Sequence, residues 1–177
     1  MKIASHNTMT YLKPDKWYMY PFRFIAKCQS KTVVEQYESG VRFFDIRIGF
    51  DKYNNPKFKH GLISFKSNIN SVISYLTSKD DVIIRIIAED DNPMFNNFCN
   101  YLEGIYGYRF CGGNRKSDWK KVYNFNNKTE YTIKECYSSM PSNPKWYGIF
   151  PWLYAKLHNK KVLSEKYNEE YLMIDFI

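Results

Sequence analysis

The sequence has no apolar run long enough to cross a bilayer and no segment that resembles a secretory leader. A membrane-spanning helix needs about 20 apolar residues, whereas the mean hydropathy of this chain is −0.55. The first residues, Met1 to His6, turn polar before the apolar stretch of roughly 7–15 residues that a leader requires could form. We therefore expect a cytoplasmic protein, with peripheral attachment to membranes left open.

Cysteine is scarce and scattered. The four cysteines, Cys28, Cys99, Cys111 and Cys136, form no C-x-x-C pair, so their spacing indicates neither a zinc site nor a disulfide framework. We expect four reduced thiols. Aromatic residues, by contrast, make up 19% of the 177 residues, which excludes a disordered chain and predicts one globular domain over residues 1–177.

Acidic residues are outnumbered by basic ones. The chain has 26 Lys and Arg against 18 Asp and Glu, a net charge of +8, which favours phosphate-bearing partners such as an anionic lipid headgroup, a soluble phosphodiester or a nucleic acid. A composition biased throughout toward Lys, Asn, Ile and Tyr gives the same charge. Only Lys120-Lys121 and Lys160-Lys161 hint at a basic cluster, so no nucleic-acid partner is expected.

Strand and helix patterns alternate through the first 107 residues. Strands are expected at 3–5, 41–48, 57–59, 82–88, 108–111, 120–125, 131–136 and 171–176, and helices at 30–39, at 67–78 and from 92 to 104 or 107, with a helical or irregular piece at 146–158. This order predicts an α/β fold with a parallel sheet. Because a complete (β/α)₈ barrel needs about 200–250 residues, we expect a small, distorted or reduced TIM barrel.

Two of the three histidines follow expected strands. His6 comes after the strand at 3–5 and His60 after the strand at 57–59, and the carboxyl ends of parallel strands are where catalytic groups gather. Two imidazoles in this position can take a proton from a nucleophile and give one to a leaving group near neutral pH. The alternative is that each histidine only hydrogen-bonds within its own loop.

Ionisable side chains also interrupt apolar strands. Asp45 and Arg47 lie two residues apart and so project from one face of their strand, and Asp175 lies within the apolar segment 171–177. Buried charges are costly, so these residues indicate either structural ion pairs or a site. A guanidinium suits a phosphate, and a carboxylate can orient a histidine. The run from Glu89 to Asp91 either holds a cation or begins a loop.

Taken together, several motifs resemble the X-region of phosphatidylinositol-specific phospholipase C. They are Ser5-His6-Asn7-Thr8, Gln36 followed by Gly40-Val41-Arg42-Phe43-Phe44-Asp45-Ile46-Arg47, then His60-Gly61 and, at the last strand, Met173-Ile174-Asp175-Phe176. The resemblance implies a distorted TIM barrel that cleaves a phosphodiester through a cyclic phosphate, with His6 as general base and His60 as general acid.

The same resemblance implies the other site residues. Asp175 would support His6, and Asp45 and Arg47 would complete the catalytic set, with Arg47 stabilising charge on phosphorus. The residues expected to bind substrate are Asn7, Arg47 and Arg85.

The chain departs from the bacterial pattern at Asn7, where those enzymes have aspartate and the calcium-dependent eukaryotic group has asparagine. Arginine at position 47 follows the bacterial pattern, however, and an arginine repels a divalent ion. We therefore expect no cofactor, with calcium held by Asn7, Asp45 and Glu89 as the alternative. The chain also lacks about a third of a usual bacterial member, mostly around the headgroup pocket, so inositol specificity does not carry over.

Two further function classes stay open beside the phosphodiesterase. One is a non-catalytic module that binds phosphate or anionic lipid on the same scaffold, and the other is a metal-dependent glycerophosphodiester phosphodiesterase. The aromatic residues Trp146, Tyr147, Phe150 and Trp152, next to Lys145 and Lys156, form either a lipid-contacting patch or part of the core.

Overall fold

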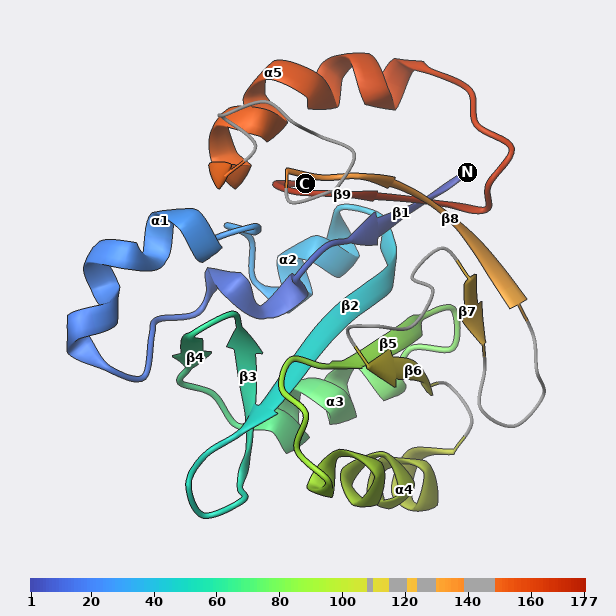
Figure 1. Ribbon diagram of the computed structural model, residues 1–177. Helices are drawn as coiled ribbons and strands as arrows, with labels where there is room; N and C mark the ends of the chain where they lie inside the picture. Colours follow the sequence, from blue (N-terminus) through green and yellow to red (C-terminus); the bar gives the residue numbers. More distant parts are fainter. Residues whose placement is uncertain (108–109, 115–120, 124–129, 139–148) are drawn as a thin grey trace.

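The computed structural model describes residues 1–107, 110–114, 121–123, 130–138 and 149–177 (Figure 1). The strands are β1 (Lys2–Ser5), β2 (Val41–Phe50), β3 (Pro56–His60), β4 (Ile63–Phe65), β5 (Ile83–Ala88), β6 (Phe110–Asn114), β7 (Lys121–Tyr123), β8 (Glu130–Cys136) and β9 (Tyr171–Ile174). The helices are α1 (Arg23–Ala26), α2 (Val33–Glu38), α3 (Ile69–Thr77), α4 (Met94–Tyr106) and α5 (Pro151–Ser164), with the 3₁₀ turns η1 (Thr8–Tyr11) and η2 (Trp17–Phe22).

The strands form one curled sheet in which six neighbours run parallel. Along the sheet the order is β6, β5, β2, β1, β9, β8, and β7 pairs antiparallel with β8. The hairpin of β3 and β4 extends the far end of β2. Among the described residues no hydrogen-bonded ladder joins β6 to β7, so the sheet curls without closing (Figure 1).

Most expected helices and strands are present, because their signals are local. The helix expected at 67–78 is α3, and the Asn68 side chain accepts a hydrogen bond from the Ser71 amide at its start. Gly107, with φ of 74°, ends α4 at the second of the two expected glycines. The strand expected at 41–48 runs two residues further, to Phe50.

Three expectations differ from the structure. The helical spacing of Val33, Val34 and Tyr37 in the segment 30–39 predicts an apolar face, but Val34 is 39% exposed, and Gln36 is buried because its side-chain amide donates to carbonyl oxygens of neighbouring loops. The aromatic segment that ends at about residue 27, whose sequence predicts a long loop, contains η1, η2 and α1, and the short strand β4 follows His60. Trp152 is 56% exposed, so it does not fill the core; Lys145, Trp146 and Tyr147 lie outside the described residues.

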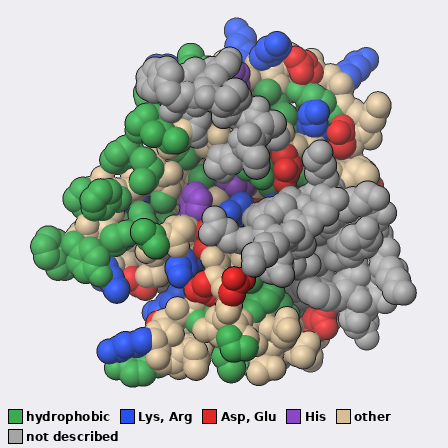
Figure 2. All heavy atoms as spheres, viewed as in Figure 1, with side chains coloured by type: hydrophobic (Ala, Val, Ile, Leu, Met, Phe, Trp, Pro, Cys, Tyr) green, Lys and Arg blue, Asp and Glu red, His purple; other side chains and the backbone are tan. Residues whose placement is uncertain are grey.

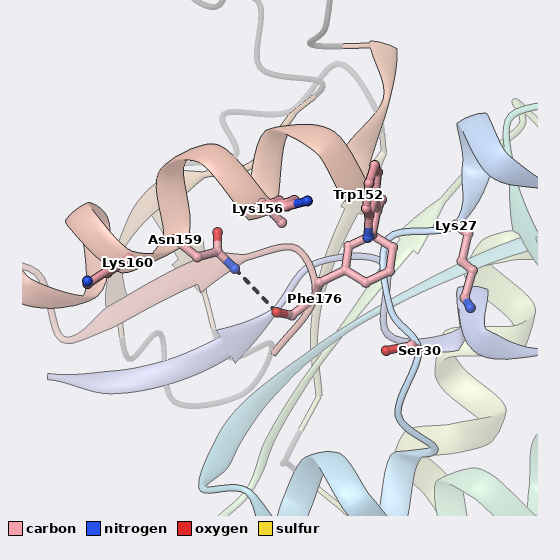
Figure 3. Close-up of a pocket in the computed structure, with 8 residues that line it drawn as sticks. Lys27, Ser30, Trp152, Lys156, Asn159, Lys160 and Phe176 are labelled. Atoms are coloured by element: carbon pink, nitrogen blue, oxygen red, sulfur yellow. Dashed lines mark hydrogen bonds between the residues drawn. The ribbon is translucent and has the colours of Figure 1, made fainter.

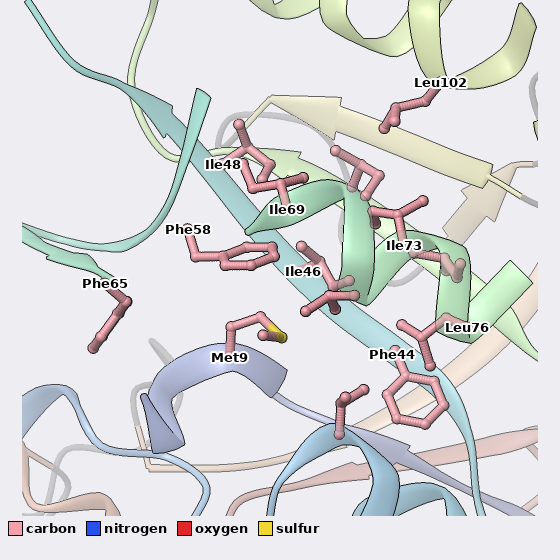
Figure 4. Close-up of a cluster of buried hydrophobic side chains, with 14 of the residues drawn as sticks. Met9, Phe44, Ile46, Ile48, Phe58, Phe65, Ile69, Ile73, Leu76 and Leu102 are labelled. Carbon is pink, nitrogen blue, oxygen red and sulfur yellow. The ribbon is translucent and has the colours of Figure 1, made fainter. Parts of the chain in front are cut away.

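The main core lies on the convex face of the sheet, between the parallel strands and the helices α2, α3 and α4 (Figures 1 and 4). Every second side chain along the strands points toward the helices and forms one side of this core, and the inner faces of the helices form the other side. Its fully buried members include Phe44, Ile46, Ile48, Ile73, Ile84 and Leu76. Packing this face fixes the sheet and leaves the carboxyl ends of the parallel strands at one edge.

No helix in the described part of the chain is both long and apolar enough to cross a bilayer. Three of the four cysteines, Cys28, Cys99 and Cys136, are free thiols. The side chain of Cys111 lies outside what the structure describes.

Candidate active site

The expected site residues come together at the carboxyl edge of the sheet. His6 follows β1, Glu89 follows β5 and Asp175 follows β9, while Asp45 lies on β2 and His60 ends β3. Because parallel strands end on the same side, residues far apart in sequence converge there. Histidine side chains are visible near the middle of this face, beside basic and acidic ones, with hydrophobic side chains gathered to the left (Figure 2).

His6 is completely buried and is held in one tautomer. Its Nδ1 lies 2.6 Å from Oδ1 of Asp175, which is also completely buried. A carboxylate only accepts, so Nδ1 carries a proton. Nε2 lies 3.0 Å from Nη2 of Arg47 and 3.1 Å from Nδ2 of Asn7, and because both of these groups only donate, Nε2 is the acceptor. The ring of Tyr137 stacks on the imidazole at 3.7 Å between centroids, which fixes the ring plane.

His60 is held in a similar way by the backbone. Its Nδ1 donates to the carbonyl oxygen of Ala26 at 2.9 Å, and its Nε2 accepts from Nδ2 of Asn7 at 3.2 Å. Desolvation, followed by the positive charge of Arg47, lowers the pKa of His60 to about 4. The imidazole of His60 is therefore neutral near pH 7. Both histidines present an unprotonated Nε2 toward the side-chain amide of Asn7.

Asn7 lies between the two histidines, whose ring centroids are 6.4 Å apart. Its backbone is left-handed, with φ of 46°, a conformation that asparagine tolerates better than most residues. The backbone nitrogen of Asn7 donates to Oδ2 of Asp45 at 3.1 Å, which stabilises this turn. The side-chain oxygen of Asn7 is buried and accepts no hydrogen bond from the described residues.

Asp45 is the centre of a buried charge network. Its Oδ1 accepts from Nε of Arg85 at 2.8 Å, and its Oδ2 accepts from Nε of Arg47 at 3.3 Å. Burial alone would raise the pKa of Asp45, but the charges of Arg85 and Arg47 outweigh it and hold that pKa well below its usual range. Arg85 is 1% exposed and also contacts Sδ of Met173. The direct substrate contact expected for Arg85 stays a prediction.

Glu89 contacts both Arg47 and the turn that follows His60. Its Oε2 lies 3.5 Å from Nη1 of Arg47, and its Oε1 accepts from the Gly61 amide at 2.6 Å. Gly61 follows His60 and has φ of 57°, in the region that glycine adopts without strain. Glu89 therefore fixes the turn that presents His60.

Sequence reasoning missed several supporting groups. Gln29 is completely buried and donates from Nε2 to the carbonyl oxygens of His6 and Ile174 at 3.1 Å each. Tyr137, which stacks on His6, and Ala26, which anchors His60, were not singled out either. The sequence carries no signal for the Ala26 contact, because a backbone carbonyl is present at every position.

Two sets of residues in the described part of the chain contain side chains that can ligate a metal ion. His6, Cys28 and Asp175 place their ligand atoms within 4.8 Å of one another, but Nη2 of Arg47 is 3.0 Å from His6. In the set of Asn7, Asp45 and Glu89, both oxygens of Asp45 accept from arginine. A cation at either place meets the positive charge of Arg47, so neither set fits a divalent ion well.

Comparison with known proteins adds a structural likeness. The chain is similar to phosphatidylinositol-specific phospholipase C from Listeria monocytogenes, with a TM-score of 0.63 and 16% identity, over 99% of this chain and 88% of that chain. Against one mutant of the Staphylococcus aureus enzyme the TM-score is 0.61 at 15% identity, and against a doubly substituted form it is 0.58 at 14%, each over 98% of this chain and 84% of that one.

At these identities the likeness establishes a shared fold. It extends over nearly the whole chain, beyond the first 90 residues and the last strand where the motifs lie. It also spans most of the compared chains, 88% of the Listeria monocytogenes chain and 84% of the two Staphylococcus aureus ones. No protein-family model and no curated protein matches the sequence.

Proposed function

We propose that this protein is a phospholipase C-like phosphodiesterase built on a reduced (β/α) barrel. It would cleave phosphatidylinositol, or a related phosphodiester with a neighbouring hydroxyl, to a cyclic phosphate without a metal. The observation that carries the proposal is the pair of unprotonated Nε2 atoms, on His6 and His60, that face one another across Asn7 beside Arg47.

In the proposed reaction, His6 is the general base. Asp175 holds the Nδ1 proton, so Nε2 is free to accept the proton of the substrate hydroxyl, whose oxygen then attacks phosphorus. The imidazolium that forms is stabilised by the carboxylate of Asp175. Arg47, which now donates to that same Nε2, would turn its Nη2 to a phosphate oxygen once the hydroxyl occupies its place.

His60 would be the general acid, which requires it to carry a proton. In the free protein the pKa of His60 is about 4, so the protonated form is a minor one near neutral pH. A bound phosphodiester anion raises this pKa, because the negative charge favours the imidazolium. The proton then passes from Nε2 to the leaving oxygen as the bond between phosphorus and that oxygen breaks.

The substrate contacts follow from the remaining polar atoms. The side-chain oxygen of Asn7, which has no hydrogen-bond donor among the described residues, would accept from a substrate hydroxyl. Arg85 is assigned a positioning role, because it reaches Asp45, which in turn orders Asn7 and Arg47.

An apolar surface beside His60 favours a lipid substrate. We call the apolar rim the exposed side chains of Trp17, Phe22, Phe24, Ile25 and Leu62, which lie on η2, on α1 and next to the His60 turn. Phe22, Ile25 and Leu62 line, together with His60, a cavity of ≈ 380 Å³. Exposed aromatic and aliphatic side chains at such a mouth suit the interface of a lipid bilayer.

The test is release of cyclic phosphate from phosphatidylinositol vesicles, followed by phosphorus NMR with excess EDTA in one arm and calcium in the other. We expect product in EDTA, and a loss of about 10²–10⁴-fold in rate for His6→Ala and for His60→Ala. His158→Ala is the matched control, since this third histidine lies on α5 and stacks on Tyr154.

Thermal denaturation of each variant separates lost chemistry from lost folding. Product only in the calcium arm would contradict the metal-independent mechanism and favour the calcium or glycerophosphodiesterase alternatives. Binding of the vesicles without any product would favour the non-catalytic module.

A further inference from the structure

A second pocket lies apart from the two histidines, between α5 and the segment that follows α1. It has a volume of ≈ 590 Å³. Figure 3 shows Lys156, Asn159 and Lys160 following one another along α5, with Lys27 across from them. The pocket is lined by Lys27, Ser30, Trp152, Ala155, Lys156, Asn159, Lys160 and Phe176.

The charged side chains around this pocket are all of one sign in the described part of the chain. Its lining holds three lysines and no acidic residue, and none of the three forms an ion pair with a described carboxylate. Lys156 and Lys160 are four residues apart on one face of α5, where like charges repel. Lys161, on the same helix, has Glu165 as its partner at 3.8 Å.

The burial of Lys27 adds to the argument. Partial desolvation and the charge of Arg23 lower the pKa of Lys27. A bound anion would reverse both effects, because it replaces lost hydration and screens the neighbouring cations. The fold thus brings a lysine from the first quarter of the chain against two from the last quarter, and an anion is the ligand that compensates them.

The pocket is joined to the candidate active site through the backbone. Lys27 follows Ala26, whose carbonyl oxygen accepts from His60, and precedes Cys28, whose carbonyl oxygen accepts from the Phe176 amide at 2.7 Å. On the other wall, Nδ2 of Asn159 donates to the carbonyl oxygen of Asp175 at 2.7 Å. An anion held by both walls would therefore tie the anchors of both histidines together.

We propose that this lysine pocket is a second, non-catalytic binding site for a phosphate group, and that its occupancy stabilises the arrangement of His60 and Asp175. The volume admits a phosphate with a substituent, and the half-exposed ring of Trp152, over which Nζ of Lys156 lies at 5.2 Å from the centroid, borders the place of that substituent. The phosphate belongs either to the headgroup of an anionic lipid or to a free phosphate compound. The binding stands by itself, whereas its effect on turnover rests on the proposed function.

The first measurement is an NMR titration of the protein with inorganic phosphate. We expect amide shifts at residues 27–30 and 156–160 that saturate together, and a loss of about tenfold in affinity for the double variant Lys156→Gln, Lys160→Gln. Lys161→Gln is the matched control and should bind as the unsubstituted protein does. The same titration in His6→Ala tests the pocket in a protein without turnover.

A second arm uses vesicles of phosphatidylcholine with or without phosphatidylglycerol. Binding to the phosphatidylglycerol vesicles that falls in the double variant but not in Lys161→Gln assigns the phosphate to a lipid. Lysine-dependent binding of inorganic phosphate alone assigns it to a soluble compound.

The proposal is overturned if the double variant binds both probes as tightly as Lys161→Gln does, or if phosphate shifts only the residues around His6 and Arg47. If binding is lysine-dependent but no substrate is turned over, the pocket stands and the proposed function fails.

Discussion

The two faces of β2 are buried to a similar degree, but only the concave face carries buried charges, beside the apolar side chain of Phe43. Phe44, Ile46 and Ile48 are fully buried against the helices of the convex face (Figure 4). Asp45 and Arg47, between them in sequence, are 0% and 7% exposed on the concave face. On the convex face, burial stabilises by roughly 25 cal/mol per Å² of apolar surface. On the concave face, burial is unfavourable until every charge has a partner.

The convex face therefore supplies the packing that stabilises the fold, whereas the concave face carries the charged groups of the candidate site. An apolar side chain on the convex face has many neighbours of similar kind, so a smaller one leaves a cavity and little else. Each charge on the concave face has specific partners, as Asp45 has in Arg47, Arg85 and the Asn7 amide. Packed hydrophobic residues can replace such a network without loss of stability. We infer that the network is maintained for the site and not for stability.

The largest stability effect should come from breaking the concave network. Arg85→Met keeps most of the side-chain volume but leaves Oδ1 of Asp45 without its partner at 2.8 Å. Removing one member of a buried pair costs about 3–5 kcal/mol. Urea denaturation should show this loss in the free energy of unfolding.

The matched control is Arg42→Met. Arg42 forms an ion pair with Asp81 at 2.6 Å, but the two side chains are 27% and 52% exposed. Exposed pairs contribute about 0–1 kcal/mol, so this variant should unfold almost as the original does. Equal losses in the two variants would mean that the concave charges are no more costly to break than surface ones.

The next effect should come from the convex face and should spare the site. Leu76 is completely buried on α3, and Leu76→Ala should reduce the free energy of unfolding by about 2–5 kcal/mol through lost burial and a cavity. Cyclic phosphate release per folded molecule should stay unchanged, because α3 packs in the convex core with Phe44, Ile46 and Ile48. Leu157→Ala, at a position 55% exposed on α5, is the control. A large loss of turnover in Leu76→Ala at full folding would contradict the separation of the two faces.

The convex face could largely be predicted from the sequence. The spacing of Ile69, Val72, Ile73 and Leu76 and the apolar strand at 82–88 are local patterns, and the elements that they predict lie where expected. Predictions weakened where the pattern conflicts with a tertiary contact, as at Val34 and Gln36 in α2. There the buried amide of Gln36 accepts from Ser5 and donates to Thr8, which no periodicity indicates.

For the concave face, the sequence predicted which residues belong to the candidate site but not how their side chains contact one another. Charges in apolar strands and histidines after strands singled out His6, Asp45, Arg47, His60 and Asp175, which the structure brings together. That Asn7 bridges both histidines depends on its left-handed backbone and on Asp45, 38 residues away. Such geometry follows from the assembled sheet, so sequence spacing cannot supply it.

The smallest expected effect is a shift in the titration midpoint of His60. It tests directly how the concave face changes the pKa of a histidine. Histidine on an exposed surface titrates near pH 6.5, whereas His60 should titrate near pH 4 by NMR of its ring protons. Arg47→Gln removes one of the causes that lower this pKa and leaves desolvation, the largest of them, so the midpoint should rise by about one pH unit and stay below the ordinary value. Lys57→Gln, on the exposed side of β3, should leave it unchanged.

The same shift has a consequence for stability. Because the pKa of His60 is lower in the folded than in the unfolded chain, the unfolded chain binds the extra proton between about pH 6.5 and pH 4. His60 therefore makes the folded state less stable as the pH falls through this window, and Arg47→Gln should reduce that dependence. A low midpoint that Arg47→Gln does not move would mean that the charge of Arg47 contributes nothing to the shift. A midpoint near 6.5 in the original protein would mean that the concave face leaves the protonation of His60 unperturbed, and His60 would then need no bound phosphate to become a general acid.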